Sequence, residues 1–241
     1  LNQTTMQVTG SSQTTKNNDK DRISIQVGLS GYSFKVYTGG DVKSSEWMNA
    51  ERIFSTPELQ KRYDEVEISV FTHKCGLVPE QFHSPDVSRE MLMETSVIGE
   101  DDVVDYVSVP QFAAVLLYSL SLGGTLSRVV TETVLRTDGT RARPLPEMYY
   151  LLESLAEIKD YNKIVASYMD DHLYIAVAQG KSLLLCNSFH SPDFTTAEYF
   201  IFLVMKKLQL NPEMSSIYFR TPLEEDQELS LYRYFRSVER I

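Results

Sequence analysis

The chain has 241 residues, 42% of them hydrophobic, and a formal net charge of −10 at pH 7. A chain of this length and apolar content can bury a substantial core, so an intrinsically disordered protein is excluded. An acidic surface repels nucleic acid and anionic lipid, so neither is a favoured partner.

The two cysteines, Cys75 and Cys186, stand apart from any CxxC or Cys/His cluster. We therefore expect neither a disulfide framework nor a metal site. The longest apolar stretches, Phe112–Tyr118 and Tyr199–Met205, are far shorter than the ~20 residues that a membrane span needs. The N-terminus lacks the layout of a signal peptide. We expect a soluble cytoplasmic protein without a membrane span.

The first half begins with a polar tail, residues 1–20, that is rich in Thr, Ser, Asn and Gln. Arg22–Tyr37 alternates apolar and polar residues on both sides of Gly28–Gly31, which predicts a β-hairpin. Further along we predict a helix over Ser45–Tyr63 that breaks at Pro57, a strand over Glu65–Thr72, a helix over Pro85–Thr95, a strand over Val103–Val109, an apolar helix over Gln111–Leu122 that ends at Gly123 and Gly124, a mixed strand over Ser127–Leu135, a turn at Asp138–Gly139 and a helix over Pro146–Ile158.

The second half repeats the opening pattern. Lys163–Tyr168 and Leu173–Ala178 are predicted strands around the turn Met169–His172. After them we predict a third strand over Ser182–Phe189, a helix over Phe194–Leu208 that is apolar on nearly every face and therefore buried, a strand over Ser216–Phe219 and a helix over Leu223–Val238.

Two internal repeats link the halves. Arg22–Val42 aligns with Lys163–Leu183 without a gap at a constant shift of 141, and apolar and turn positions coincide although only three residues are identical. The pentapeptide FHSPD occurs at residues 82–86 and again at 189–193, at a shift of 107. The difference of 34 is explained by an insertion in the first half, most of it Ser45–Tyr63. We therefore predict a collinear duplication with one insertion.

Each FHSPD copy precedes a predicted helix. Ser, Pro and Asp are favoured residues at a helix N-terminus, as a cap, a residue with preset φ and an acid near the positive end of the dipole. This interpretation is preferred over a role for His83 and His190 as ligands or catalysts.

A hairpin, a third antiparallel strand, a helix and further strand–helix units, all occurring twice, resemble the actin-like ATPase fold. In that fold two ribonuclease H-like domains flank a nucleotide cleft. The runs at residues 77–80 (LVPE) and 184–189 (LLCNSF) are similar to an uncharacterised bacterial family, a domain of unknown function assigned this fold. The resemblance implies an α/β protein with one ribonuclease H-like domain at 21–160, which carries a helical insertion near 45–63. A second, C-terminally truncated domain is implied at 161–241, related to the first by internal duplication.

The resemblance also implies a nucleotide motif in the first hairpin. There, actin-like ATPases carry an Asp, an apolar residue, a Gly and then Ser or Thr. The Asp organises the metal, and the turn amides hold phosphate. In this chain Gly28 matches and Ser30 nearly does, but Gln26 stands in the place of the Asp. A neutral amide does not replace a carboxylate beside magnesium.

The second hairpin departs further from the motif. Ser167 and Met169 occupy the positions of the Asp and the Gly, while Asp170 and Asp171 lie displaced in the turn, where they are most simply turn formers. A Gly pair expected later, for adenosine, is replaced by Arg, Thr and Pro at residues 220–222.

These departures favour a non-hydrolysing actin-like scaffold that binds another protein, with no catalytic residues. The alternative is a weak or atypical ATP-binding protein that uses Gly28, Ser30 and Gly31, with Asp170 or Asp171 near a magnesium ion. A third possibility, nuclease activity on the ribonuclease H-like core, needs several carboxylates at one strand end, and the sequence does not assemble them.

Overall fold

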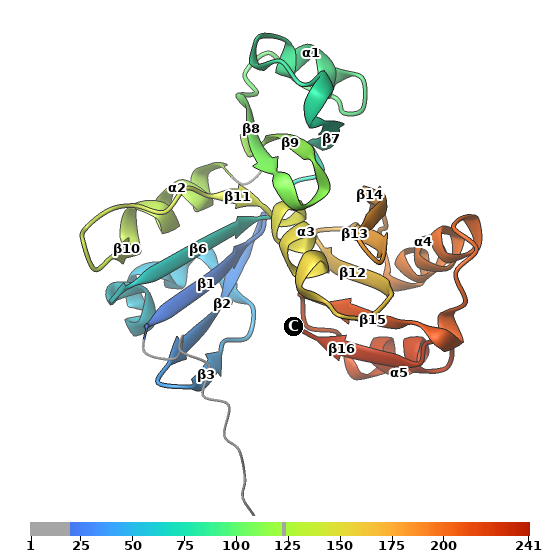
Figure 1. Cartoon of the computed structure of the whole chain (residues 1–241). Coiled ribbons are helices and arrows are strands. Elements are labelled where there is room, and N and C mark those ends of the chain that lie inside the picture. Colours follow the sequence, from blue (N-terminus) through green and yellow to red (C-terminus); the bar gives the residue numbers. More distant parts are fainter. Residues whose placement is uncertain (1–19, 122–123) are drawn as a thin grey trace, which may run out of the picture.

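The computed structural model describes residues 20–121 and 124–241. Two large β-sheets stand side by side with the helix α3 (Glu147–Glu157) between them (Figure 1). The helix α2 (Gly124–Thr133) covers the outer face of the first sheet, and α4 (Phe194–Lys207) and α5 (Glu225–Tyr232) cover the outer face of the second. The predicted N-terminal tail lies outside the described residues, except for Lys20.

The two sheets have the same strand order. Read from the edge next to the hairpin, the first sheet has the order β3-β2-β1-β6-β11 and the second has the order β14-β13-β12-β15-β16. In each, the opening hairpin and the third strand pair antiparallel, and the two later strands join in parallel. The strands of the first sheet are β1 (Arg22–Val27), β2 (Gly31–Thr38), β3 (Asp41–Ser44), β6 (Glu65–Val70) and β11 (Leu145–Pro146), with β4 (Met48–Asn49) beside β2. Those of the second are β12 (Asn162–Met169), β13 (His172–Gln179), β14 (Ser182–His190), β15 (Ser216–Phe219) and β16 (Ser237–Arg240).

The 141-residue shift holds in three dimensions. β2 and β13 span residues 31–38 and 172–179, and β3 and β14 begin at residues 41 and 182. The turn that follows each hairpin contains a glycine in the left-handed region, Gly39 and Gly180, each with φ +56°. The predicted mixed α/β architecture, with the same hairpin pattern in both halves, is therefore confirmed. Duplication as the origin of the likeness, and the domain limits at 21–160 and 161–241, stay predictions.

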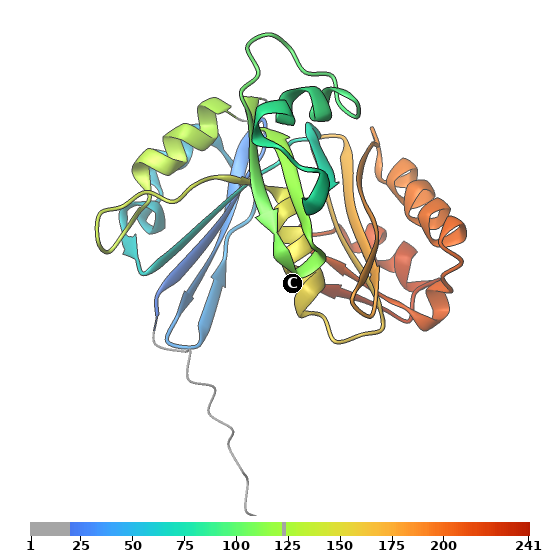
Figure 2. The same ribbon diagram turned by 45° about the horizontal axis from the view of Figure 1, so that its top comes forward.

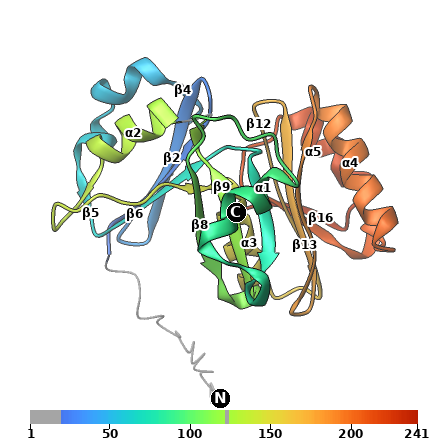
Figure 3. The ribbon, with the colours of Figure 1, turned by 90° about the horizontal axis from the view of Figure 1, so that it is seen from above.

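A third, antiparallel sheet interrupts the first half. It contains β7 (Cys75–Pro79), β8 (Val104–Val109) and β9 (Ala114–Ser119) in the order β7-β9-β8, and α1 (Ser88–Met93) packs on it through Leu92. This sheet stands above α3, between the two large sheets (Figure 2, Figure 3).

Two predictions in this region are wrong. The apolar run predicted as the helix Gln111–Leu122 is β9, which is buried throughout and paired on both sides. The predicted strand Ser127–Leu135 is instead α2 and the residues after it, so Gly124 begins a helix rather than ending one. Val130 and Val134, four residues apart, both pack into the first core, and this burial overrides the strand preference of β-branched residues.

The predicted helix Ser45–Tyr63 is also wrong as a single element. The segment forms β4, two short 3₁₀-helices (Ala50–Ser55 and Pro57–Gln60) and the strand β5 (Arg62–Tyr63), which pairs with β10 (Leu135–Arg136). Pro57 does mark a break, since it begins the second 3₁₀-helix.

The FHSPD copies do not occupy equivalent positions. The first follows β7 in the third sheet, and the second joins β14 to α4 in the second large sheet. The strand equivalent to β14 is β3, which follows the first hairpin directly. The prediction that an insertion before the third strand explains the difference of 34 is therefore wrong. In the second copy Asp193 is the N-cap and accepts from the Thr196 N–H at 2.7 Å. In the first copy Ser84 makes no side-chain cap.

The C-terminal elements need two corrections. The predicted helix Leu223–Val238 ends early: α5 stops at Tyr232, and the chain then adds β16 beside β15. α4 is not buried on every face, because Ala197 and Ile201 enter the core while Tyr199 is 61% exposed. The remaining predictions are confirmed within a few residues, namely β6, α1, β8, α3, β12, β13, β14 and β15.

Candidate functional site

The two hairpin turns touch each other at the junction of the two sheets. The Leu29 N–H in the first turn donates a hydrogen bond of 2.8 Å to Asp170 Oδ2 in the second. These two positions are themselves related by the 141-residue shift, so each turn meets its own counterpart. Asp170 and Asp171 have φ of +51° and +58°, the left-handed conformation that a two-residue type I′ turn needs at both central positions.

The glycines of the first turn are required by close packing. A Cβ on Gly28 would lie 2.6 Å from Asp170 Oδ2 and 2.9 Å from Trp47 Cζ2. A Cβ on Gly31 would lie 2.1 Å from the Met48 carbonyl oxygen. The backbone that resembles a phosphate-binding turn is thus held against protein atoms, and an aspartate side chain accepts from one of its amides.

A fully buried carboxylate lies at the centre of the junction. Glu147, the first residue of α3, is 0% exposed. Its Oε1 accepts from Gln26 Nε2 at 3.1 Å and from Ser167 Oγ at 2.7 Å. Gln26 and Ser167 are the two positions where the resemblance implies metal-organising aspartates, so both aspartate positions carry hydrogen-bond donors that bind this one glutamate.

The two neighbouring strands complete the cluster. Ser69 in β6, which pairs with Gln26, donates to Glu147 Oε2, and Arg220, which follows β15, donates from Nε to Oε1 at 2.9 Å. Arg220 also donates from Nη1 to Ser154 Oγ at 3.2 Å. We call Glu147, Gln26, Ser69, Ser167 and Arg220 the central cluster. It joins both sheets to α3 and pairs a buried negative charge with one positive charge.

The structure brings together only part of the predicted nucleotide site. Gly28, Gly31 and Asp170 meet at the junction. The side chains of Ser30 and Asp171 are exposed, and the Asp171 carbonyl accepts from the Ser191 N–H at 2.7 Å. Among the described residues no three His, Cys, Asp or Glu side chains are arranged to hold a metal ion. Sequence reasoning missed Glu147 and Arg220, because an acid at a helix start and an Arg after a strand carry no local signal of their partners.

Three of the four histidines gather beside the second turn. The rings of His73 and His172 stack with centroids 4.5 Å apart, and the His172 and His190 centroids are 5.2 Å apart. His172 Nδ1 donates to the Asp170 carbonyl at 2.8 Å, which links the histidines to the turn. Burial, followed by the charges of His172, Lys74 and His190, lowers the pKa of His73.

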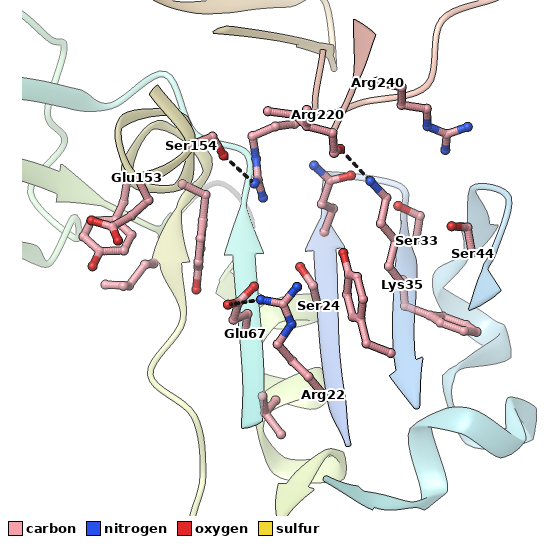
Figure 4. A pocket seen from close by; sticks show the side chains of 18 of the residues that line it. Arg22, Ser24, Ser33, Lys35, Ser44, Glu67, Glu153, Ser154, Arg220 and Arg240 are labelled. Carbon is pink, nitrogen blue, oxygen red and sulfur yellow. Dashed lines mark hydrogen bonds and ion pairs between the residues drawn. The ribbon is translucent and has the colours of Figure 1, made fainter. Parts of the chain in front are cut away.

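A basic cleft of about 590 Å³ lies between the first sheet and α3, and two members of the central cluster, Gln26 and Arg220, line it (Figure 4). Six cationic and three acidic side chains line it: Arg22, Lys35, Arg136, Arg143, Arg220 and Arg240 against Glu67, Glu153 and Glu157. Burial, followed by the charges of Arg240 and Arg220, lowers the pKa of Lys35 to about 8.

The sequence matches the family described as "Protein of unknown function (DUF3822)" over residues 11–238. The chain belongs to this family. No curated protein matches the sequence. Among solved structures it is similar to a Bacteroides thetaiotaomicron protein described as having an actin-like ATPase fold and unknown function. The TM-score is 0.66 and the identity 17%, over 93% of this chain and 91% of that one.

A second similar structure is the PilM–PilN type IV pilus biogenesis complex. The TM-score is 0.51 and the identity 12%, over 91% of this chain and 88% of that one. At these identities the likeness shows the fold alone, and it confirms the predicted actin-like ATPase fold. No helix among the described residues has the length and apolar character to cross a membrane.

Proposed function

We propose that this protein is a non-hydrolysing actin-like scaffold that binds another protein. The observation that carries the proposal is the central cluster. Gln26 and Ser167, at the two positions where the resemblance implies catalytic-metal aspartates, are hydrogen-bond donors to the buried Glu147. The turn amide of Leu29 is engaged by Asp170. A site built for Mg²⁺ and phosphate presents carboxylates to the metal and free amides to the phosphate. Here the Asp170 carboxylate accepts from the Leu29 amide, and the Glu147 carboxylate accepts from Gln26 and Ser167.

The PilM–PilN complex supports the protein-binding half of the proposal. That structure shares the fold and is a complex between two proteins. We also propose a cytoplasmic location, which agrees with the two free thiols Cys75 and Cys186.

The test is isothermal titration of the protein with Mg²⁺–ATP, together with a phosphate-release assay. We expect no saturable binding and no phosphate release above the buffer rate. The matched variant is Asp170→Ala, which removes the carboxylate from the Leu29 amide without touching the central cluster. Tight binding by the unaltered protein with turnover would overturn the proposal.

A second candidate is weak, atypical nucleotide binding at the hairpin junction, favoured by the meeting of Gly28, Gly31 and Asp170 there. The phosphate would need to displace Asp170 from the Leu29 amide, and Ser30 and Asp171 would supply further polar groups. On this alternative, wild-type protein binds ATP measurably and Asp170→Asn or Asp171→Asn changes the affinity. Equal heats for wild type and both variants would remove it.

A further inference from the structure

The third sheet and α1 carry exposed apolar side chains that the rest of the described chain does not cover. Figure 1 shows that α1 and the chain around it project beyond both large sheets. Six large apolar side chains of this region are at least 40% exposed, and we call them the lobe surface: Phe82, Val87, Met93, Val97, Val103 and Tyr106. Exposed apolar side chains that gather in one region among polar groups mark interaction sites.

The two FHSPD copies show that this exposure is not a consequence of the local sequence. In the second copy Phe189 packs against the core of the second sheet and stacks on Phe200 with ring centroids 4.6 Å apart, and Asp193 caps α4. In the first copy Phe82 is 64% exposed, and no side chain caps the turn that begins at Pro85. The residues that stabilise the fold in the second copy are thus left facing solvent in the first.

The lobe surface belongs to one compact segment. Arg89 donates from Nη1 to the Asp102 carbonyl at 2.7 Å and from Nη2 to the Gly99 carbonyl at 2.6 Å, which holds the loop after α1 against the helix. The rings of His83 and Tyr106 have centroids 4.7 Å apart, which joins the chain before α1 to β8. The exposed apolar side chains are therefore presented on a fixed frame.

Negative charge is concentrated in the same segment. Residues 80–106 contain eight acidic residues and one arginine, so they hold a formal charge of −7 in a chain of −10. Asp102 and Asp105 pair with Lys74 and Arg143. The other six acids are exposed and make no ion pair within the described part of the chain: Glu80, Asp86, Glu90, Glu94, Glu100 and Asp101. Apolar groups among unpaired carboxylates fit a segment that brings cations and apolar side chains together, and they repel anionic lipid and nucleic acid.

We infer that the lobe surface binds a basic, amphipathic segment of a partner protein. The apolar side chains of that segment would cover Phe82 and Met93, and its lysines or arginines would face Asp86, Glu90 and Glu94. On α1 both kinds of group are neighbours, since Glu90 and Glu94 are four residues apart with Met93 beside them, all three exposed. This inference rests on the proposed scaffold function and names the chemistry of its partner.

The test is fluorescence anisotropy of the whole chain with a labelled peptide of leucine and lysine, whose leucines recur every three or four residues so that they share one helical face. We expect saturable binding to the wild type. The double variant Phe82→Ser, Met93→Ser should lose affinity about tenfold or more, because two apolar contacts are removed. Its matched control is Phe54→Ser, Met214→Ser, which removes the same residue types at exposed positions outside the lobe surface and should bind as the wild type does.

The contribution of charge is tested by a second pair of variants. Glu90→Gln, Glu94→Gln should weaken binding about threefold or more, whereas Glu225→Gln, Glu228→Gln, in the exposed first turn of α5, should leave it unchanged. A peptide of the same charge with serine in place of leucine should bind about tenfold more weakly or worse.

Three results would overturn the inference: no saturable binding of the leucine–lysine peptide to folded wild-type protein, equal affinity for the serine peptide, or equal losses in the lobe variants and their controls. The serine peptide separates docking on the lobe surface from a general attraction of cations to an acidic protein. Failure here leaves the ATP titration standing, because that experiment concerns the hairpin junction.

Discussion

At the scale of single residues, Glu147 is the side chain on which the two halves depend most. It is fully buried, and its partners come from both sheets. Glu147→Gln keeps the shape but leaves Arg220 without its counter-charge and turns an amide group toward the donor Gln26. Removing one partner of a buried ion pair typically costs about 3–5 kcal/mol, so we expect a loss near that size in urea unfolding followed by circular dichroism.

The control for this variant is Glu157→Gln, an exposed acid on the same helix, which should change stability by less than about 0.5 kcal/mol. The double variant Glu147→Gln, Arg220→Gln should recover part of the loss, because it leaves no unpaired charge. Equal, small losses for Glu147→Gln and Glu157→Gln would show that the central cluster is not a determinant of stability.

His73 makes a residue-scale prediction about pH. Its pKa in the folded protein is lowered by burial and by the neighbouring His172, Lys74 and His190. The unfolded chain therefore binds more protons as pH falls through about 6.5, the ordinary histidine pKa. Stability should be highest above that pH and should fall on acidification towards the folded-state pKa. His73→Phe should flatten this dependence between pH 7 and 5.5 in urea unfolding, whereas His83→Gln, outside the three-histidine group, should leave it unchanged. A wild-type slope of zero, or one that survives His73→Phe, would contradict the prediction.

At the scale of secondary-structure elements, local patterns predicted most of the strands, including the continuously buried β13, but failed at β9 and α2. The apolar run in β9 has no period, since both its faces are covered, and so it resembled a buried helix. α2 is rich in the β-branched residues Val and Thr, and only its packing against the first sheet reveals its helical period. FHSPD was correctly placed near helix starts, but the identical sequence does not report which sheet the helix joins.

The two FHSPD copies provide a matched pair of substitutions. Asp193 caps α4 and accepts from Thr196, which also lowers the pKa of Asp193, whereas the first copy has no side-chain cap. Asp193→Ala should lower the melting temperature measurably, and Asp193→Ser should retain most of the cap. Asp86→Ala, at the matching position of the first copy, should have almost no effect. Equal shifts for Asp193→Ala and Asp86→Ala would mean that the cap contributes nothing to α4.

At the scale of the whole molecule, the hairpin repeat predicted the most. The shift of 141 gave the register of both hairpins and placed Gln26 opposite Ser167 across the junction. The convergence of these residues on Glu147 was not predictable from the sequence. Gln26 and Glu147 are 121 residues apart in the chain, and their contact depends on how α3 lies between the sheets. The third sheet was likewise not predicted as a sheet, because its strands lie outside the segments that the 141-residue repeat relates.

The closure of the junction can be measured at one amide. Because the Leu29 N–H donates to the Asp170 carboxylate across the two halves, its hydrogen exchange reports how often the turns separate. A hydrogen bond to a charged group contributes about 1.5–3 kcal/mol, so Asp170→Ala should speed exchange at Leu29 about tenfold or more. Asp171→Asn, at an exposed position of the same turn and with a residue that tolerates its φ of +58°, should leave that rate unchanged. Slow exchange in the wild type would mean that the two halves stay joined at the position where an ATPase of this fold admits phosphate. Fast exchange in the wild type, unaffected by Asp170→Ala, would instead mean that the turns open freely, and the nucleotide-binding alternative would then be favoured over the scaffold.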